Sequence, residues 1–213
     1  MQSSTAAFNL IVTEEVSSES YYTKHYQHFE FPGGASGPTV GIGYDCGYAT
    51  PQEIRDSWTG IISDESVEAL IKASGIRGER AHQFVKEHGK SVTISWIQAF
   101  SEFRGNEMPK WEARVRSSLP NTNLLTGDCF GALVSLSYNR GTGGFHDPGS
   151  RFVEMRAIRS LMESKQFDKI PDQFMNMRRL WPNVSGLRHR REREADLFRK
   201  GLSTVEKARN EVK

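Results

Sequence analysis

Cysteine is scarce in this sequence, and several features that define large classes of proteins are missing. Cys46 and Cys129 are the two cysteines among 213 residues. Two cysteines are too few for a disulfide scaffold, and these are too far apart for a CxxC metal or redox motif. The six histidines show no HExxH or other paired spacing. We therefore expect no metal ion and no cofactor.

Long apolar runs are also missing. No stretch reaches the roughly 18 residues that a membrane-spanning helix needs, and the N-terminal residues lack both a basic flank and a sustained apolar segment. The sequence therefore predicts a protein made in the cytoplasm without a signal peptide and without an integral membrane segment. Hydrophobic residues make up 37% of the chain and charged residues 25%, which is typical of a folded globular protein.

Charge of one sign does not dominate, because the net charge is only +2. Residues 1–50 nevertheless contain one Lys and five acidic residues, a net charge of −4, whereas residues 178–200 contain eight basic and three acidic residues, a net charge of +5. The acidic residues of the basic segment stand at the spacings of intrahelical ion pairs. We expect this segment to form a solvated face that attracts an anionic cell wall, and we expect no nucleic-acid binding.

Helical signals dominate the chain after residue 50. Thr50, Pro51 and Glu53 have the pattern of a capping box with proline at the first helical position, and Ser63 is suited to cap the next helix. A first helix is expected around residues 13–20. Further helices are predicted from residue 63 to near Gly75, over residues 79–88, from Thr93, after Pro109, and over residues 126–138, 152–163, 170–180 and 186–199, with Gly201 as a C-terminal cap.

Residues 31–48 differ from the rest of the chain. Six glycines and two prolines exclude a helix there. The segment TVGIGY from Thr39 to Tyr44 has the composition of a short strand, which predicts a small hairpin or irregular sheet. It contains no GxGxxG or GxxxxGK[ST] pattern, which excludes a nucleotide-binding loop. We predict an α+β fold with a small Gly-rich β lobe and a predominantly helical lobe. The expected organisation is a lead-in over residues 1–12, a single domain over residues 13–204 and a frayed tail over residues 205–213.

Carboxylates occur in and before this Gly-rich segment. Cleavage of a glycosidic bond needs one protonated carboxyl that donates to the leaving oxygen and one ionised carboxylate that acts on water or on the cationic transition state. Glu15 and Asp45 have the side chains for these two roles, with Thr39 between them in the sequence. By themselves, however, these residues do not distinguish a catalytic pair from solvated surface charges.

Three short motifs together resemble the phage-type lysozymes of glycoside hydrolase family 24. They are TVGIGYDCGY at residues 39–48, ALVSLSYNRG at residues 132–141 and GLRHRRERE at residues 186–194, and they occur in the family's order. The resemblance implies a lysozyme-like fold. It also implies hydrolysis of the β-1,4 bond between N-acetylmuramic acid and N-acetylglucosamine in peptidoglycan glycan strands, by a monomer that needs no metal or cofactor.

The spacing of the acidic residues departs from the common phage pattern. That pattern has an acidic residue six positions before the Thr, where this chain has Gly33. Asp45 instead follows Thr39 by six positions, as in the pesticin-like branch of these muramidases. The resemblance therefore implies that Glu15 is the general acid, that Asp45 positions or activates the water, and that Thr39 helps to hold it. Glu14 and Glu30 remain alternatives for the acid.

The resemblance also implies residues that bind the substrate. Asn139 and Arg140 match a stretch that lines the family's cleft, although Asn139 is equally suited to cap a helix. Tyr44 and Tyr48 flank Asp45 and are suited either to stack on sugar rings or to pack in the fold. Trp181 matches a core tryptophan of the family.

Two other functions remain open. One is a non-catalytic module that binds peptidoglycan or another partner, and the other is a chitinase-like or chitosanase-like glycosidase. For a muramidase, the biological role is that of a phage endolysin or of an antibacterial effector with delivery machinery and an immunity protein. Either would act on the cell wall or in the periplasm after release or delivery.

Overall fold

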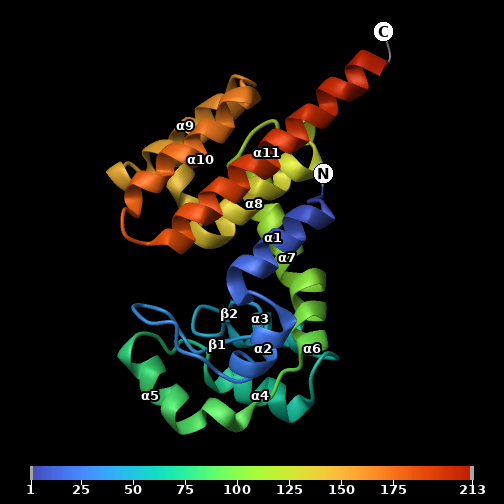
Figure 1. Cartoon of the computed structure of the whole chain (residues 1–213). Helices are drawn as coiled ribbons and strands as arrows, with labels where there is room; N and C mark the ends of the chain where they lie inside the picture. The colour runs from blue at the N-terminus through green and yellow to red at the C-terminus, as the bar shows by residue number, and fades with distance from the viewer. Residues whose placement is uncertain (1, 212–213) are drawn as a thin grey trace. The chain divides into compact units, whose positions relative to one another are not determined.

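The structure is a computed structural model in which residues 2–211 are described (Figure 1). The chain divides into two compact units. The N-terminal unit is residues 12–109, and the C-terminal unit combines residues 110–213 with residues 1–11. Helix α1 (Thr5–Val16) contributes residues to both units. We describe each unit by itself.

The predicted α+β, lysozyme-like fold with a small β lobe is wrong. Helices account for 69% of the structure, and the strands found in residues 2–211 are β1 (Thr39–Val40) and β2 (Tyr44–Asp45). The predicted hairpin forms at the expected place, but each strand is only two residues long. The glycines and prolines around it explain why: Gly33, Gly34, Gly41 and Gly43 all adopt positive φ angles, so the backbone turns instead of extending the ladder. The molecule is essentially all-helical.

The N-terminal unit begins with the end of α1, which starts earlier than the helix predicted around residues 13–20. Ser17 stops this helix with a φ of 62°, and Ser18 caps the next one by accepting a hydrogen bond from the Tyr21 N–H. The helices of this unit are α2 (Glu19–His25), α3 (Pro51–Trp58), α4 (Asp64–Lys72), α5 (Glu79–His88) and α6 (Trp96–Glu102), with a 3₁₀ turn at Gly89–Ser91 and a π-helical turn at Phe103–Glu107.

Local capping signals in this unit were predicted well. The capping box of α3 is present, with Thr50 and Glu53 bonded to each other's backbone N–H groups. Ser63 caps α4 as expected. The expected start of a helix at Thr93 is wrong, because Ser95 caps α6 with Gln98 as its reciprocal partner. A second capping pattern close along the chain thus determined where this helix begins.

The core of the N-terminal unit surrounds the indole of Trp58, which is fully buried. Tyr44 packs edge-on against this ring with a centroid separation of 5.5 Å. Gly41 lies over the same ring, and a Cβ at this position would come within 3.1 Å of it. Tyr22 is also fully buried and donates a hydrogen bond of 2.9 Å to the Ile94 carbonyl. The hairpin is therefore held against the helices by aromatic packing.

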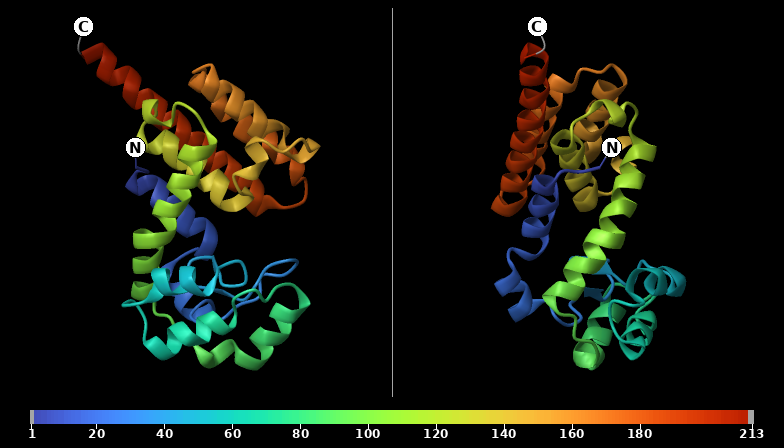
Figure 2. Two further views of the ribbon diagram at one scale, coloured as in Figure 1. Left: turned by 180° about the vertical axis from the view of Figure 1, so that it is seen from behind. Right: turned by 90° about the vertical axis from the view of Figure 1, so that its right-hand side faces the viewer.

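The C-terminal unit consists of helices. They are α7 (Met108–Ser118), α8 (Gly127–Arg140), α9 (Val153–Glu163), α10 (Ile170–Met177) and α11 (Ser185–Glu211), joined by 3₁₀ turns at Thr122–Leu124, Gly143–Phe145, Ser150–Phe152, Phe167–Lys169 and Arg178–Leu180. Helix α11 packs along both α8 and α10, as the views in Figure 2 show. None of the helices in residues 2–211 is both long and apolar enough to cross a membrane.

Helix α11 extends beyond the predicted end at residue 199. Gly201 does not cap it, but lies inside the helix where α11 meets the start of α8. A Cβ on Gly201 would stand 2.4 Å from the Thr126 hydroxyl oxygen and 2.6 Å from the Cys129 sulfur, so glycine is needed here for the close approach of the two helices. Helix α11 continues to Glu211, and residues 212 and 213 lie outside the described residues. The frayed tail over residues 205–213 stays a prediction.

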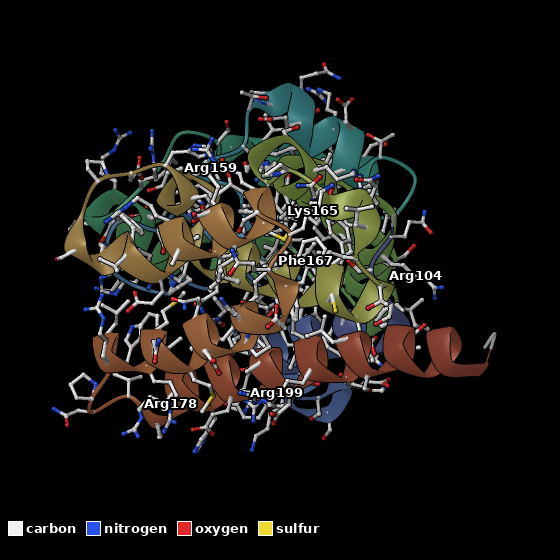
Figure 3. All side chains as sticks on the ribbon, turned by 90° about the horizontal axis from the view of Figure 1, so that it is seen from above. Arg104, Arg159, Lys165, Phe167, Arg178 and Arg199 are labelled. Atoms are coloured by element: carbon white, nitrogen blue, oxygen red, sulfur yellow. The ribbon has the colours of Figure 1, made fainter. Side chains whose placement is uncertain are left out.

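The basic segment at residues 178–200 is not simply a solvated face, as the sequence had suggested. Arg190, Arg191 and Glu194 of α11 are almost completely buried. Glu194 forms a 2.8 Å ion pair with Arg191 and accepts a 2.7 Å hydrogen bond from the Ser135 hydroxyl of α8. Arg199, in contrast, lies on the outside of α11 (Figure 3) and pairs with Asp196 at 3.0 Å. The alternation of charge in the sequence thus reflects a buried cluster as well as a surface.

We predict that Glu194→Ala lowers the free energy of unfolding by roughly 3–5 kcal/mol, because it leaves two buried guanidinium groups without their carboxylate. Guanidinium chloride denaturation followed by circular dichroism would measure the loss. Arg199→Ala is the control on the same helix, and we expect it to change the free energy of unfolding by no more than about 0.5 kcal/mol. Equal effects of the two substitutions would contradict the structural role of the buried cluster.

Candidate active site

Thr39 and Asp45 face each other across the hairpin. The register of β1 and β2 pairs Thr39 with Asp45 and Val40 with Tyr44, and the turn between them passes through Gly41 and Gly43, which both have positive φ angles. Directly opposed residues of an antiparallel pair place their side chains on the same face of the sheet. The sequence spacing of six thus brings two of the three predicted catalytic side chains together.

The carboxylate of Asp45 is bonded to the backbone of the loop around it. Its oxygens accept hydrogen bonds from the Gly37 N–H at 3.1 and 3.0 Å and from the Gly47 N–H at 2.9 Å. Both glycines are buried, and a Cβ on Gly37 would lie 2.4 Å from Asp45 Oδ1 and 2.5 Å from the Gly47 Cα. The absence of side chains at these two positions is what lets the loop close around the carboxylate.

Two opposing influences act on the pKa of Asp45. Partial burial is the larger and raises the pKa above its usual range, while the N–H groups of Gly37, Gly47 and Tyr48 and the positive charge of Arg77 lower it. The net shift is upward. Burial disfavours the charged form, and the backbone N–H groups compensate for only part of that cost.

Thr39 links this loop to a third segment. Its hydroxyl donates a 3.2 Å hydrogen bond to the Gly37 carbonyl. Its backbone forms a bridge with Glu30, in which the Glu30 N–H donates to the Thr39 carbonyl at 2.9 Å and the Thr39 N–H donates to the Glu30 carbonyl at 2.8 Å. Glu30 is therefore part of the same small sheet, a position that the sequence did not indicate.

Glu15 lies in the last turn of α1, half-buried, beside Glu14, which is also half-buried. Its position relative to the hairpin is indicated by Tyr26, which follows α2. Burial raises the pKa of Tyr26, and the nearby Tyr21, Glu30 and Glu15 raise it further, in that order. Glu15 and Glu30 thus both lie within electrostatic range of one phenol hydroxyl.

The two tyrosines that flank Asp45 have different environments. Tyr44 is buried against Trp58, and its packing role leaves no face for a sugar. Tyr48 is 59% exposed; its hydroxyl donates to the Ala35 carbonyl at 3.1 Å, and the Arg77 guanidinium lies 4.6 Å from the centre of its ring. Of the two, Tyr48 is the one that can reach a ligand.

Asn139 and Arg140 lie at the end of α8 in the C-terminal unit. The Arg140 guanidinium stands 5.0 Å from the Trp181 ring centre and 5.5 Å from that of Phe152, and it donates a 2.6 Å hydrogen bond to the Arg151 carbonyl. Burial, followed by the charges of neighbouring arginines, lowers the pKa of Arg140 to about 10. Arg140 is thus held inside its own unit. It is the last residue of α8, and the C-cap residue is Gly141, so Asn139 does not cap the helix.

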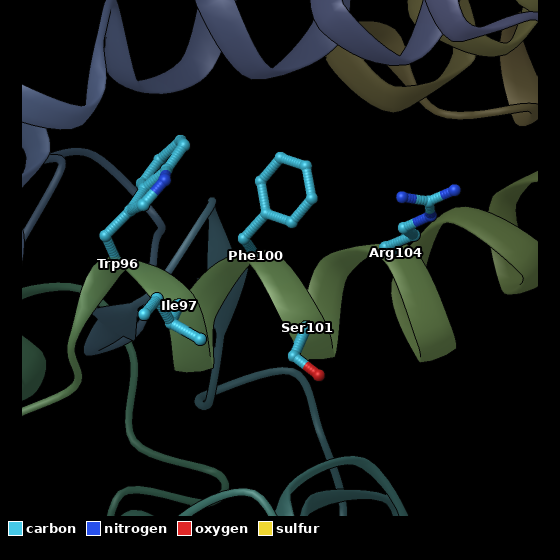
Figure 4. Close-up of a pocket in the computed structure, with 5 residues that line it drawn as sticks. All are labelled: Trp96, Ile97, Phe100, Ser101 and Arg104. Atoms are coloured by element: carbon cyan, nitrogen blue, oxygen red, sulfur yellow. The ribbon is translucent and has the colours of Figure 1, made fainter.

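A hollow of about 320 Å³ lies along α6 (Figure 4). Trp96, Phe100 and Arg104 line one side at spacings of four residues, and Ile97 and Ser101 complete the lining. These side chains supply apolar surface and one positive charge, but no carboxyl group for acid–base chemistry. Within residues 2–211, no three His, Cys, Asp or Glu side chains are grouped so that they could hold a metal ion.

Residues 10–106 match the model of a family described as a domain of unknown function (DUF8812). The matched stretch corresponds closely to the N-terminal unit and includes Glu15, Thr39 and Asp45. No curated protein matches the chain. The match thus indicates that the unit with the predicted catalytic residues recurs in other proteins, and its description assigns no activity.

We predict that Gly37→Ala lowers the free energy of unfolding by roughly 1–3 kcal/mol, because the new methyl group would overlap the Asp45 carboxylate and the Gly47 backbone. Thermal unfolding measured by circular dichroism would detect the loss. Gly105→Ala is the control in the same unit: its Cβ would meet open space inside a helical segment, and we expect it to be neutral or stabilising. An unaffected melting temperature for Gly37→Ala would show that the loop does not close around Asp45 as described.

Proposed function

We propose that the chain is a peptidoglycan hydrolase that cleaves the β-1,4 bond between N-acetylmuramic acid and N-acetylglucosamine. Glu15 would act as the general acid, Thr39 would help to hold the attacking water, and a carboxylate beside Thr39 would act on that water. The resemblance assigns this last role to Asp45. The proposal concerns the chemistry of these residues and does not depend on a β lobe. It requires neither a metal ion nor a cofactor.

The observation that carries the proposal is the direct opposition of Thr39 and Asp45 in the hairpin. A catalytic Thr that holds a water molecule and a carboxylate that acts on the same water must present their side chains to one face. Glu15 supports the proposal through its place in the same unit and through the electrostatic neighbourhood of Tyr26, which it shares with Glu30.

The environments of the carboxyl groups are suited to divided roles. A glycosidase needs one carboxyl that stays protonated and one that stays ionised, and the protein achieves this by giving them different surroundings. Asp45 accepts hydrogen bonds from backbone N–H groups, which favour its ionised form and oppose the effect of burial. Glu15 lies in different surroundings, half-buried in the last turn of α1.

One observation favours a second function. Because the Asp45 carboxylate is engaged by the loop backbone, the same residues are consistent with a non-catalytic module that binds peptidoglycan. Chitin and chitosan remain alternative substrates for the hydrolase. As a muramidase, the protein would act on the cell wall after release or delivery, either as a phage endolysin or as an antibacterial effector neutralised by an immunity protein.

We predict that Glu15→Gln lowers the rate of peptidoglycan hydrolysis by roughly 10²–10⁴-fold, the usual contribution of a general acid. The loss of turbidity of purified cell walls would report the rate. Glu14→Gln is the matched control, because it makes the same chemical change one residue away on the same helix turn, and we expect it to retain nearly full activity.

Four other results are informative. Equal activity of both variants and the wild type would contradict the role of Glu15. A loss of activity confined to Glu14→Gln would assign the general acid to Glu14. If the wild-type protein sediments with cell walls but does not clear them, the chain is a binding module. Clearance of chitin in place of cell walls would reassign the substrate.

A further inference from the structure

Glu30, Thr39 and Asp45 form one row across the small sheet. Glu30 bridges to Thr39 through two backbone hydrogen bonds of 2.9 and 2.8 Å, and Thr39 pairs with Asp45 in the hairpin. Both pairings are antiparallel. Side chains of directly opposed residues project from the same face, so two carboxyl groups flank the Thr39 hydroxyl.

The two carboxyl groups differ in what they contact. Asp45 is bonded to the N–H groups of Gly37 and Gly47, which shape the loop. The Glu30 carboxylate accepts no hydrogen bond and forms no ion pair within residues 2–211, and the residue is exposed. Its backbone is nevertheless fixed by the bridge to Thr39. A base that activates water must be both positioned and accessible to water, and Glu30 meets both conditions better than Asp45.

Burial and nearby charges act on the pKa of Glu30 in opposite directions. Partial burial of its carboxyl raises the pKa above the usual range, while His28 and His25 lower it. Glu30 and Glu15 in turn both raise the pKa of the Tyr26 hydroxyl. Glu30 is therefore joined to the hairpin through its backbone, and it shares the electrostatic surroundings of Tyr26 with Glu15.

We propose that Glu30 is the catalytic base of this site and that Asp45 is a positioning residue that holds the loop around Thr39. This assignment rests on the proposed function. As the water oxygen bonds to the anomeric carbon, a water proton passes to Glu30. The bond from that carbon to the glycosidic oxygen breaks, its electron pair stays on the oxygen, and Glu15 donates a proton to it. The products are a free hemiacetal and an alcohol, and no further reactant is needed.

The test compares Glu30→Gln with Asp45→Asn in the full chain, using the release of reducing ends from purified peptidoglycan. We expect Glu30→Gln to lower kcat by roughly 10²–10⁴-fold with an unchanged melting temperature. The wild-type rate falls at low pH as the base is protonated, and this acidic limb should disappear in Glu30→Gln. Asp45→Asn should lower the melting temperature, and it should lower the kcat of the folded protein less than Glu30→Gln does.

Glu30→Ala with added sodium formate distinguishes catalysis from structure. A small carboxylate that occupies the vacated space can accept the water proton, so we expect formate to restore part of the rate of Glu30→Ala and to leave Asp45→Asn unaffected. The formate experiment tests the role of Glu30 even if Asp45→Asn does not fold.

Failure of the assignment and failure of the proposed function give different results. A wild-type protein that releases no reducing ends overturns both. An active wild type with Glu30→Gln near the wild-type rate, or with Glu30→Ala inactive but not rescued by formate, overturns the role of Glu30 alone.

Discussion

The carboxylate of Asp45 organises the part of the molecule on which the proposed chemistry depends. Its bonds to the N–H groups of Gly37 and Gly47 close a loop that contains few other regular interactions. Thr39 is fixed within that loop, and through Thr39 the loop is joined to Glu30. Strands of two residues provide little stability of their own. The hairpin therefore depends mainly on this polar contact and on the packing of Tyr44 against Trp58.

The proposed hydrolysis requires carboxyl groups close to Thr39, and this arrangement supplies them in an essentially helical protein. The N-terminal unit needs only a short row of paired residues, not a β lobe, to bring Glu30, Thr39 and Asp45 to one face. The end of α1 supplies Glu15. The C-terminal unit is stabilised separately by a buried cluster in which Glu194 neutralises Arg191. Its role in the proposed hydrolysis rests on the resemblance at Asn139 and Arg140.

Local signals in the sequence predicted local structure, but they did not predict contacts between residues that are distant in the sequence. The capping box of Thr50 and Glu53 and the place of the hairpin both depend on neighbouring residues, and both were predicted correctly. Gly201 resembled a helix cap, but its approach to Cys129 depends on the packing of two helices. The predicted β lobe failed for a related reason: composition indicated strands but not how far pairing would extend. The bridge of Glu30 to Thr39 was likewise not predicted, because the loop between these residues has no periodic pattern of apolar residues.

The identity of the bond that is cut tests the account most directly. Purified peptidoglycan digested by the wild-type protein can be analysed by mass spectrometry before and after borohydride reduction. The account predicts disaccharide peptides whose reducing end is N-acetylmuramic acid. Fragments that end in reducing N-acetylglucosamine, free stem peptides, or undigested peptidoglycan would contradict it.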